Sequence, residues 1–324
     1  MTRLKLLINK DDPTASIHQP LLHQFAVRRC QRLTAIIIKP YFDIVTWQQG
    51  VNYSRNDHVL VVNSIRPVNS SDWYRPYLND SYKIIIDNLW ESSQVMYRFP
   101  DPIENCFVLQ NQNWFWYNES SLNRDNWIKY QPARTCQKLA LLPMRQRREH
   151  RDALLVYLSE ILDQIVWSYT SHGRTLPNDA IENHDKNFQR HVNPEWYDNT
   201  HFSIVAETLV EAPEIFVTEK TFKPMAFYHP FVVMAQARHL KYLRDMGFET
   251  FDNLFDESYD NIEDWTQRLA ALVATIKNFD PVPHNQLTLQ KLEHNHNRFY
   301  DQSLIESRVI NEIINPMIEY AESR

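Results

Sequence analysis

The run TEKTFKP, which begins at Thr218, places one acid and two lysines between two apolar stretches. A helix can begin here in two registers: Thr218 caps a first turn that holds Glu219 and Lys220, or Pro224 takes the first helical position. In both registers backbone N–H groups without helical partners lie near Lys220 and Lys223, and helix N-termini bind anions through such groups. The run, called here the TEKTFKP segment, therefore predicts an anion site that needs no glycine.

The acid at this site needs an explanation, because a carboxylate repels an anion. Glu219 could accept hydrogen bonds from the two ribose hydroxyls of a nucleotide sugar while the lysines meet the neighbouring pyrophosphate. The simpler alternative is a solvated helix cap with an ion pair between Glu219 and Lys223, four residues apart. The residues alone leave both interpretations open.

A second basic run, MRQRREHRDALL, contains Arg145, Arg147, Arg148 and Arg151. This arginine segment lies between an apolar run and a helical pattern, so it also marks a strand-to-helix junction. Cations near a helix N-terminus oppose the helix dipole, and a bound phosphate would remove that cost. The alternative is an exposed charged face in which Glu149 is the partner of an arginine.

Short apolar runs alternate with amphipathic segments in the first part of the chain, which predicts β/α alternation. Four runs suit buried parallel strands, and a fifth, aromatic run suits the last or edge strand. These runs are 4–9, 33–40, 58–65, 82–90 and 106–122.

The polar stretch 122–137 predicts a domain boundary, after which the pattern restarts. We expect a helix whose apolar face runs from Ala153 to Ile165, a helix that ends at Gly247, and mostly helical structure over the last 65 or so residues. Strands are expected at 138–144, 165–169, 202–208, 215–219 and 230–235.

Composition limits the partners and the compartment. The 324 residues carry a net charge of −6, which argues against an extensive basic surface for nucleic acid but allows a local basic groove. Three glycines are too few for Gly-rich phosphate loops, and three widely spaced cysteines suggest reduced thiols. No signal peptide or membrane span is evident, so we expect a soluble, cytoplasmic protein.

Residues 202–233, FSIVAETLVEAPEIFVTEKTFKPMAFYHPFVV, resemble the donor-binding segment of fucosyltransferase-like glycosyltransferases. They are more similar to a group of poorly characterised bacterial and phage glycosyltransferases that have TEKTFKP and a downstream Gly-Phe-x-Thr-Phe to Ser-Tyr-Asp element. That element is here GFETFDNLFDESYDNI, residues 247–262. The resemblance covers roughly residues 138–270. The sequence departs from the fucosyltransferase pattern where AET replaces Phe-Glu-Asn and SHGRT replaces a Gly-rich turn, so the donor remains open.

The resemblance implies an α/β protein of the GT-B fold, in which two Rossmann-like domains face each other across a cleft. An acceptor-side domain would comprise residues 1–130 and a nucleotide-sugar-binding domain residues 131–280. Helices over 281–324 would complete the chain.

The resemblance also implies roles for individual residues. Glu219 would bind the ribose, Lys220 a donor phosphate, and Arg151 the pyrophosphate. Glu207 would face the donor sugar or order the loop that follows it, and Tyr259 would border the donor or pack in the core. The expected donor-binding set is completed by Arg145, Thr218 and Lys223.

The reaction implied is transfer of a sugar from a nucleotide-sugar donor to an acceptor hydroxyl, with inversion and without a metal or other cofactor. The positive side chains and the helix dipole would stabilise the leaving diphosphate. The family base is an acid after a strand of the first domain, and Asp87 and Glu91 occupy that place here. Either acid can instead be an ordinary cap.

Two other functions remain open. A phage-type enzyme could glycosylate a hydroxylated base in DNA, with the arginines partly serving the phosphate backbone. Alternatively, the chain could be a non-catalytic nucleotide-sugar-binding module. The acceptor would accordingly be a glycan, a small molecule or modified DNA.

Overall fold

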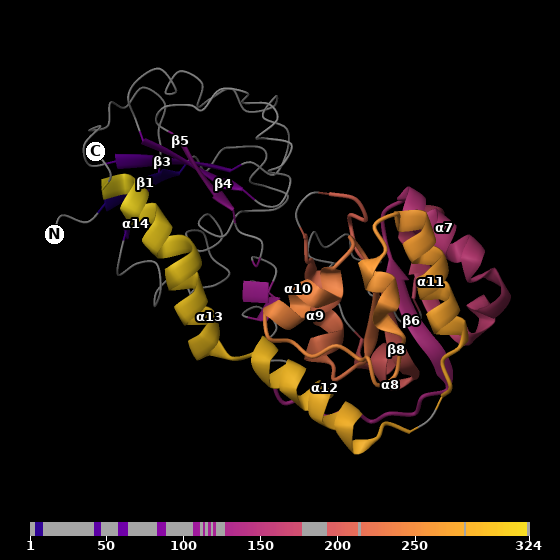
Figure 1. Cartoon of the computed structure of the whole chain (residues 1–324). Helices are drawn as coiled ribbons and strands as arrows, with labels where there is room; N and C mark the ends of the chain where they lie inside the picture. The colour runs from indigo at the N-terminus through magenta and orange to yellow at the C-terminus, as the bar shows by residue number, and fades with distance from the viewer. Residues whose placement is uncertain are drawn as a thin grey trace. The chain divides into compact units, whose positions relative to one another are not determined.

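The computed structural model shows an α/β protein (Figure 1). It describes the backbone of five strands in the first part of the chain. It also describes residues 113, 116, 117, 119, 120 and 127–322, apart from 177–192, 213–214 and 282. No helix among these residues is long and apolar enough to cross a membrane.

The chain forms two compact units. One comprises Met1–Leu122 together with Asp301–Arg324, and the other comprises Asn123–Tyr300. The helices after residue 280, expected as one C-terminal segment, are therefore divided between the two units.

The first unit contains a five-stranded, fully parallel sheet with the order β2-β1-β3-β4-β5. This order is common among doubly wound α/β sheets. The strands are β1 (Leu4–Ile8), β2 (Phe42–Thr46), β3 (His58–Asn63), β4 (Lys83–Asn88) and β5 (Cys106–Gln110). The strands predicted in 4–9, 58–65, 82–90 and 106–122 are thus confirmed. The run 33–40 lies outside the described residues, and β2 was not predicted.

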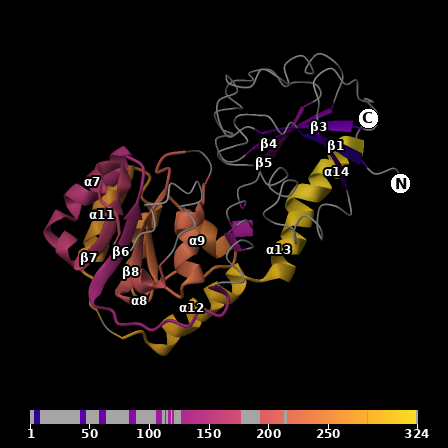
Figure 2. The same cartoon turned by 180° about the vertical axis from the view of Figure 1, so that it is seen from behind.

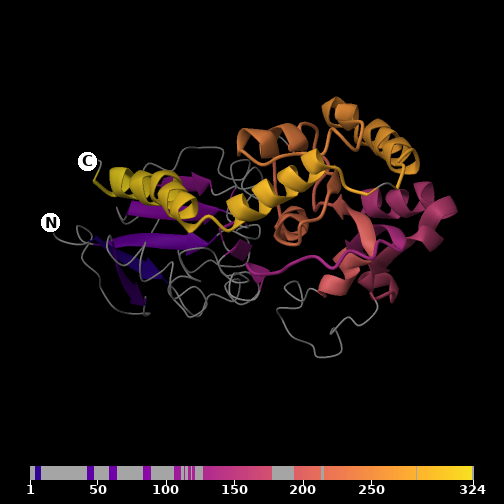
Figure 3. The same cartoon turned by 90° about the horizontal axis from the view of Figure 1, so that it is seen from below.

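The last two helices of the chain belong to this first unit, where the C-terminal helices run beside its strands (Figure 3). They are α13 (Gln302–Val309) and α14 (Asn315–Glu322), joined by a π-helical turn at Ile310–Ile314. Within that turn, Glu312 accepts hydrogen bonds from the Asn113 amide and the Tyr117 hydroxyl, at 3.0 and 2.5 Å. These contacts fasten the C-terminal helices to the segment after β5.

The second unit contains a four-stranded parallel sheet with the order β7-β6-β8-β9. Its strands are β6 (Lys138–Met144), β7 (Ile165–Tyr169), β8 (Thr200–Ala206) and β9 (Phe231–Met234). The four strands predicted at these places are confirmed. Their side chains are largely buried, as the continuous apolar runs predicted.

The strand predicted at 215–219 is wrong. Phe216 and Val217 are buried, but they pair with no strand, and Glu219 already begins a helix. The short apolar run enters the core from a loop, so its hydrophobicity reflects burial rather than sheet pairing.

The helix predicted across Ala153–Ile165 is shorter than expected, because α7 (Glu149–Tyr157) is followed by a 3₁₀ turn at Ser159–Gln164. Among the other described helices of this unit, the one at Pro194–Asp198 was not predicted, and the rest agree with the predicted pattern, including the end of α10 before Gly247, whose φ is +83°. These other helices are α8 (Pro194–Asp198), α9 (Glu219–Ala226), α10 (His239–Asp245), α11 (Trp265–Lys277) and α12 (Gln286–Phe299).

Helices cover both faces of the second sheet. Helices α7 and α11 pack together on one side, and α9 and α12 pack together on the other (Figures 1 and 2). The sheet is thereby enclosed, which leaves its strand ends as the places where polar side chains can gather. The carboxyl ends of β6 and β8 lead into the arginine segment and towards the TEKTFKP segment, respectively.

Candidate functional site

The two polar segments meet at the topological switch point of the second sheet. Strands β6 and β8 are neighbours, but the chain leaves β6 through α7 to reach β7 on one side, and leaves β8 through α9 to reach β9 on the other. In open parallel sheets such a divergence leaves a crevice outside the carboxyl ends of the strands, where ligands bind. The arginine segment and the TEKTFKP segment both lie at this edge.

The start of α9 follows the first of the two predicted registers. The Thr218 hydroxyl accepts the Lys220 N–H at 3.3 Å, so Thr218 is the N-cap and Glu219 stands in the first turn. Pro224 lies inside the helix and not at its first position. The charged residues of the segment are therefore presented at a helix N-terminus.

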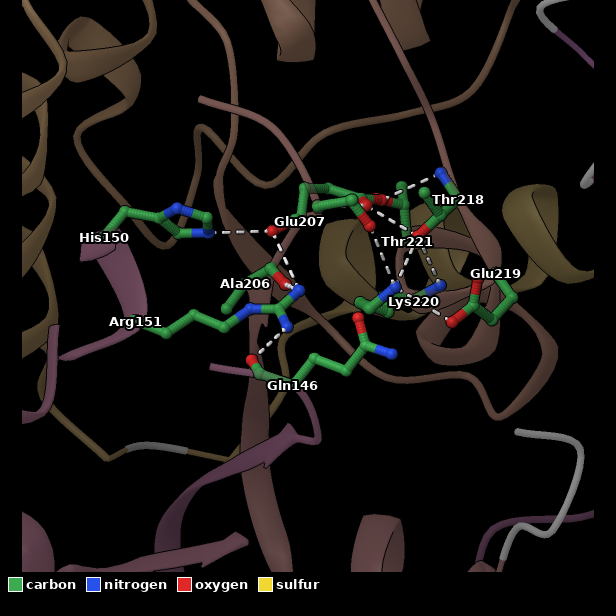
Figure 4. Close-up of polar contacts among 10 residues, drawn as sticks. Gln146, His150, Arg151, Ala206, Glu207, Thr218, Glu219, Lys220 and Thr221 are labelled. Carbon is green, nitrogen blue, oxygen red and sulfur yellow. Dashed lines mark hydrogen bonds and ion pairs between the residues drawn. The ribbon is translucent and has the colours of Figure 1, made fainter. Parts of the chain in front are cut away.

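Glu207, directly after β8, holds this N-terminus in place (Figure 4). Its buried carboxylate accepts the Thr218 N–H at 2.9 Å, the Thr218 hydroxyl at 2.6 Å and the Thr221 hydroxyl at 2.7 Å. It also accepts the Thr208 N–H at 3.1 Å. Of the two roles left open for Glu207, these contacts favour the ordering of the loop.

The start of α7 braces the end of β8 from the other side (Figure 4). The Arg151 guanidinium donates to the carbonyl oxygens of Gln146, Ala206 and Glu207 at 2.9, 2.9 and 3.0 Å. His150 Nε2 lies 2.9 Å from the same Glu207 oxygen, which can only accept, so Nε2 carries the proton. Burial lowers the pKa of His150 to about 4, so this side chain is neutral at pH 7.

Arg151 therefore differs from its expected role as an open phosphate ligand. Its side chain is only 2% exposed, and both terminal nitrogens are bound to main-chain oxygens. Burial lowers the pKa of the guanidinium, against the opposing effect of the Glu207 and Glu219 carboxylates. Arg151 lies at the predicted site, but as a brace between α7 and β8.

Glu219 and Lys220 form an ion pair, with 2.9 Å between the carboxylate and the ammonium. Lys220 Nζ also donates to the hydroxyls of Thr218 and Thr208 at 3.1 and 3.4 Å. Burial alone would raise the pKa of Glu219, which is 7% exposed, but the Lys220 and Lys223 charges outweigh it and lower the pKa to about 2. Glu219 is therefore ionised throughout the neutral range.

Arg145, directly after β6, is a further cation on which the charge of this carboxylate acts. Its side chain is exposed, and the pKa of its guanidinium is lowered by partial burial while the Glu219 charge opposes that effect. Arg147, by contrast, pairs with Asp152 at 2.8 Å, where the sequence suggested Glu149 as a partner. The charge of Glu219 therefore acts on a cation from each segment: Lys220 of the TEKTFKP segment and Arg145 of the arginine segment.

Tyr259 lies in the core. Its buried hydroxyl accepts the Val233 N–H of β9 at 3.1 Å, and burial raises the pKa of the phenol. The neighbouring Asp260 caps α10 by accepting the N–H groups of Leu240 and Lys241. These contacts favour the packing alternative for Tyr259 over a place beside the donor.

The two acids proposed as the base are less completely described. Asp87 is the next-to-last residue of β4, where its backbone is in register with Asn63 and Leu109, so it lies at the carboxyl end of that strand. Glu91 lies outside the described residues. Their role stays a prediction.

Sequence reasoning missed two members of the site, His150 and Thr221. Thr221 stands at the third position of α9, where a side chain can turn back towards the cap, and this spacing was a usable signal. His150 gave no signal, because its partner is a main-chain oxygen 57 residues away.

The described residues contain no group of three or more His, Cys, Asp or Glu side chains that could hold a metal ion. Comparison with known proteins assigns no family: no protein-family model matches the chain, and no curated protein shows significant similarity to it.

Proposed function

We propose that this protein is a glycosyltransferase that transfers a sugar from a nucleotide-sugar donor to an acceptor hydroxyl. The observation that supports this best is the Lys220–Glu219 ion pair at the switch point between β6 and β8, whose carboxylate also acts electrostatically on Arg145, directly after β6. If the strands are counted along the chain within each sheet, both sheets begin with the order second, first, third, fourth. This common order also fits a pair of Rossmann-like domains. The GT-B arrangement of these domains is part of the proposal.

The charges at the site match the parts of a nucleoside diphosphate. The Lys220 ammonium and the exposed Arg145 guanidinium would meet the pyrophosphate at the N-terminus of α9. The longest contact of Lys220, 3.4 Å to the Thr208 hydroxyl, is the one that a phosphate oxygen would replace most easily. The ionised Glu219 would accept the two ribose hydroxyls.

Arg151 has an indirect part in this proposal. Since its terminal nitrogens hold the end of β8, it would position the loop that leads to the TEKTFKP segment. In this proposal Arg145, which is exposed at the end of β6, contacts the phosphate in place of Arg151.

The reaction is a displacement at the anomeric carbon. The acceptor oxygen forms a bond to that carbon, the bond from the carbon to the phosphate oxygen breaks, and the nucleoside diphosphate leaves with the electron pair. A carboxylate, Asp87 or Glu91, takes the acceptor proton. Attack opposite the leaving group inverts the configuration, and the cations at the switch point stabilise the charge on the diphosphate.

Calorimetry and thermal shift with GDP, UDP, TDP and CMP sugars test the proposal. A true donor stabilises the fold by mass action, and Lys220→Met and Arg145→Met should each weaken its binding about tenfold or more. Arg147→Met is the matched control, because Arg147 is an exposed arginine paired with Asp152. The proposal fails if no nucleotide sugar stabilises the wild-type protein, or if all three variants bind alike.

Transfer assays then separate an enzyme from a binding module. Asp87→Asn and Glu91→Gln should leave donor binding intact, and the variant that lacks the base should lose transfer. Donor binding without any transfer by the wild-type protein, tested over glycan, small-molecule and hydroxylated-DNA acceptors, would contradict catalysis.

A further inference from the structure

Glu207 is the most fully engaged acid at the switch point. Its carboxylate is buried, and both oxygens receive hydrogen bonds. Three of the four donors come from Thr218 and Thr221, at the start of α9. Burying a polar group is costly unless hydrogen bonds compensate it, so the buried Glu207 side chain depends on its donors in the TEKTFKP segment.

The carboxylate determines the direction of the Thr218 hydroxyl. The Glu207 carboxylate accepts the Thr218 hydroxyl at 2.6 Å, so the Thr218 O–H points to Glu207. The lone pairs of the same hydroxyl then face away and accept the Lys220 N–H at 3.3 Å and Lys220 Nζ at 3.1 Å. A side-chain amide at position 207 has one acceptor atom and one donor atom, and cannot accept all of these bonds.

The main chain of Glu207 is fixed as well. Its carbonyl oxygen receives His150 Nε2 and the Arg151 guanidinium, and its N–H donates to the Met234 carbonyl of β9 at 2.9 Å. The main chain of Glu207 is therefore bound to α7 and to the sheet, while its carboxylate is bound to the start of α9. Glu207 thus connects α9 to both.

We propose that Glu207 is a positioning residue that, through the Thr218 hydroxyl, holds the Lys220 ammonium beside Glu219 and so forms the anion site. The identity of the anion, the diphosphate of a nucleotide sugar, rests on the proposed function. The contacts that place the ammonium do not depend on it.

The first test needs no ligand. The ¹³C chemical shift of the Glu219 carboxyl reports its pKa, which the Lys220 and Lys223 charges hold at about 2. Glu207→Gln and Thr218→Val are both close in size to the native residues, and each should raise this pKa towards the ordinary value of 4.5 because Lys220 loses its support. Thr218→Ser keeps the hydroxyl, so the pKa of Glu219 should stay low in this variant.

Glu257→Gln provides the matched control. Glu257 is another poorly exposed carboxylate of the same unit, and it accepts a threonine hydroxyl, that of Thr250, at 2.8 Å and the Arg244 guanidinium at 2.8 Å. Its replacement should lower stability without moving the Glu219 pKa. The positioning role is refuted if Glu219 titrates alike in the wild-type protein, Glu207→Gln and Thr218→Val.

The second test is a double-mutant cycle with the nucleoside diphosphate that binds the wild-type protein most tightly. Glu207→Gln should weaken binding about tenfold, and this effect should disappear when Lys220 is already methionine. Additive losses would mean that Glu207 acts on the ligand by another route and would overturn the proposal. If no diphosphate binds the wild-type protein, the proposed function fails, and the ligand-free titration still decides the role of Glu207.

Discussion

Replacing Glu219 by glutamine removes the negative charge at the centre of the site while keeping the size of the side chain. The pKa of Glu219 falls from an ordinary 4.5 to about 2 in the folded protein. Because the folded-state pKa is the lower one, ionisation stabilises the fold fully above pH 4.5, and this stabilisation is lost as the pH falls towards 2. A shift of that size corresponds to about 3 kcal/mol.

We therefore expect Glu219→Gln to lower the free energy of unfolding by about 3 kcal/mol at pH 7. This difference should be smaller by about 1 kcal/mol at pH 4, because the wild-type protein has by then lost about that much of the stabilisation that ionised Glu219 provides. Urea denaturation of both proteins at pH 7 and pH 4 measures the two differences. The titration of His150 is common to both proteins and cancels in the comparison.

Glu160→Gln is the control for this experiment. Glu160 pairs with Lys277 at 2.7 Å, a shorter contact than the 2.9 Å between Glu219 and Lys220, but its side chain is 78% exposed. Water screens such a pair, so little change in stability is expected. Our reasoning is refuted if Glu219→Gln is as stable as the wild-type protein at pH 7, or if its deficit is the same at pH 4.

Three further substitutions test the surroundings of the site. Arg151→Met removes a donor from three main-chain carbonyls, of which that of Glu207 keeps His150 Nε2, and should lower the free energy of unfolding by about 2–4 kcal/mol in urea denaturation; unchanged stability would argue against the brace. His150 is buried and neutral with a pKa of about 4, so the wild-type protein should lose stability as the pH falls from 6.5 towards 4, and His150→Gln should flatten this slope in thermal melts at pH 7.5 and 5; equal slopes would contradict the assignment. Gly247→Ala should cost about 1–3 kcal/mol in urea denaturation, because Gly247 has a φ of +83° and a Cβ there would lie 2.5 Å from the Arg298 guanidinium; a wild-type midpoint would show that the turn adapts.

The sequence predicted the elements that could be recognised from local pattern. The apolar runs of β6, β7 and β9 have the length of buried strands, β7 and β9 also carry β-branched residues, and Gly247 ends α10 as expected. Local pattern failed at 215–219, where the apolar residues of a loop enter the core without pairing. A strand and a buried loop bury the same side chains, and only hydrogen-bond partners distinguish them.

The residue types of the site were also predictable, whereas their roles were not. An acid beside lysines after a cap residue predicted Glu219 and Lys220 in the first turn of a helix. The ion pair considered from the sequence joined Glu219 to Lys223, whereas the structure shows one between Glu219 and Lys220. The sequence could not say that Arg151 is closed off by carbonyl oxygens while Arg145 is exposed, because all the arginines of the segment have the same chemistry. Which of these arginines is buried depends on which strand lies next to β6.

The sequence by itself thus determined which charges stand at the two strand-to-helix junctions. Only the tertiary structure decided that these junctions share one edge, because the sheet order places β8 beside β6 although α7 and β7 separate them along the chain. That order also brings the Glu207 carbonyl to Arg151 and the Glu207 carboxylate to Thr218. Hydrogen bonds over such separations arise from packing of the whole sheet, which no local run of residues encodes.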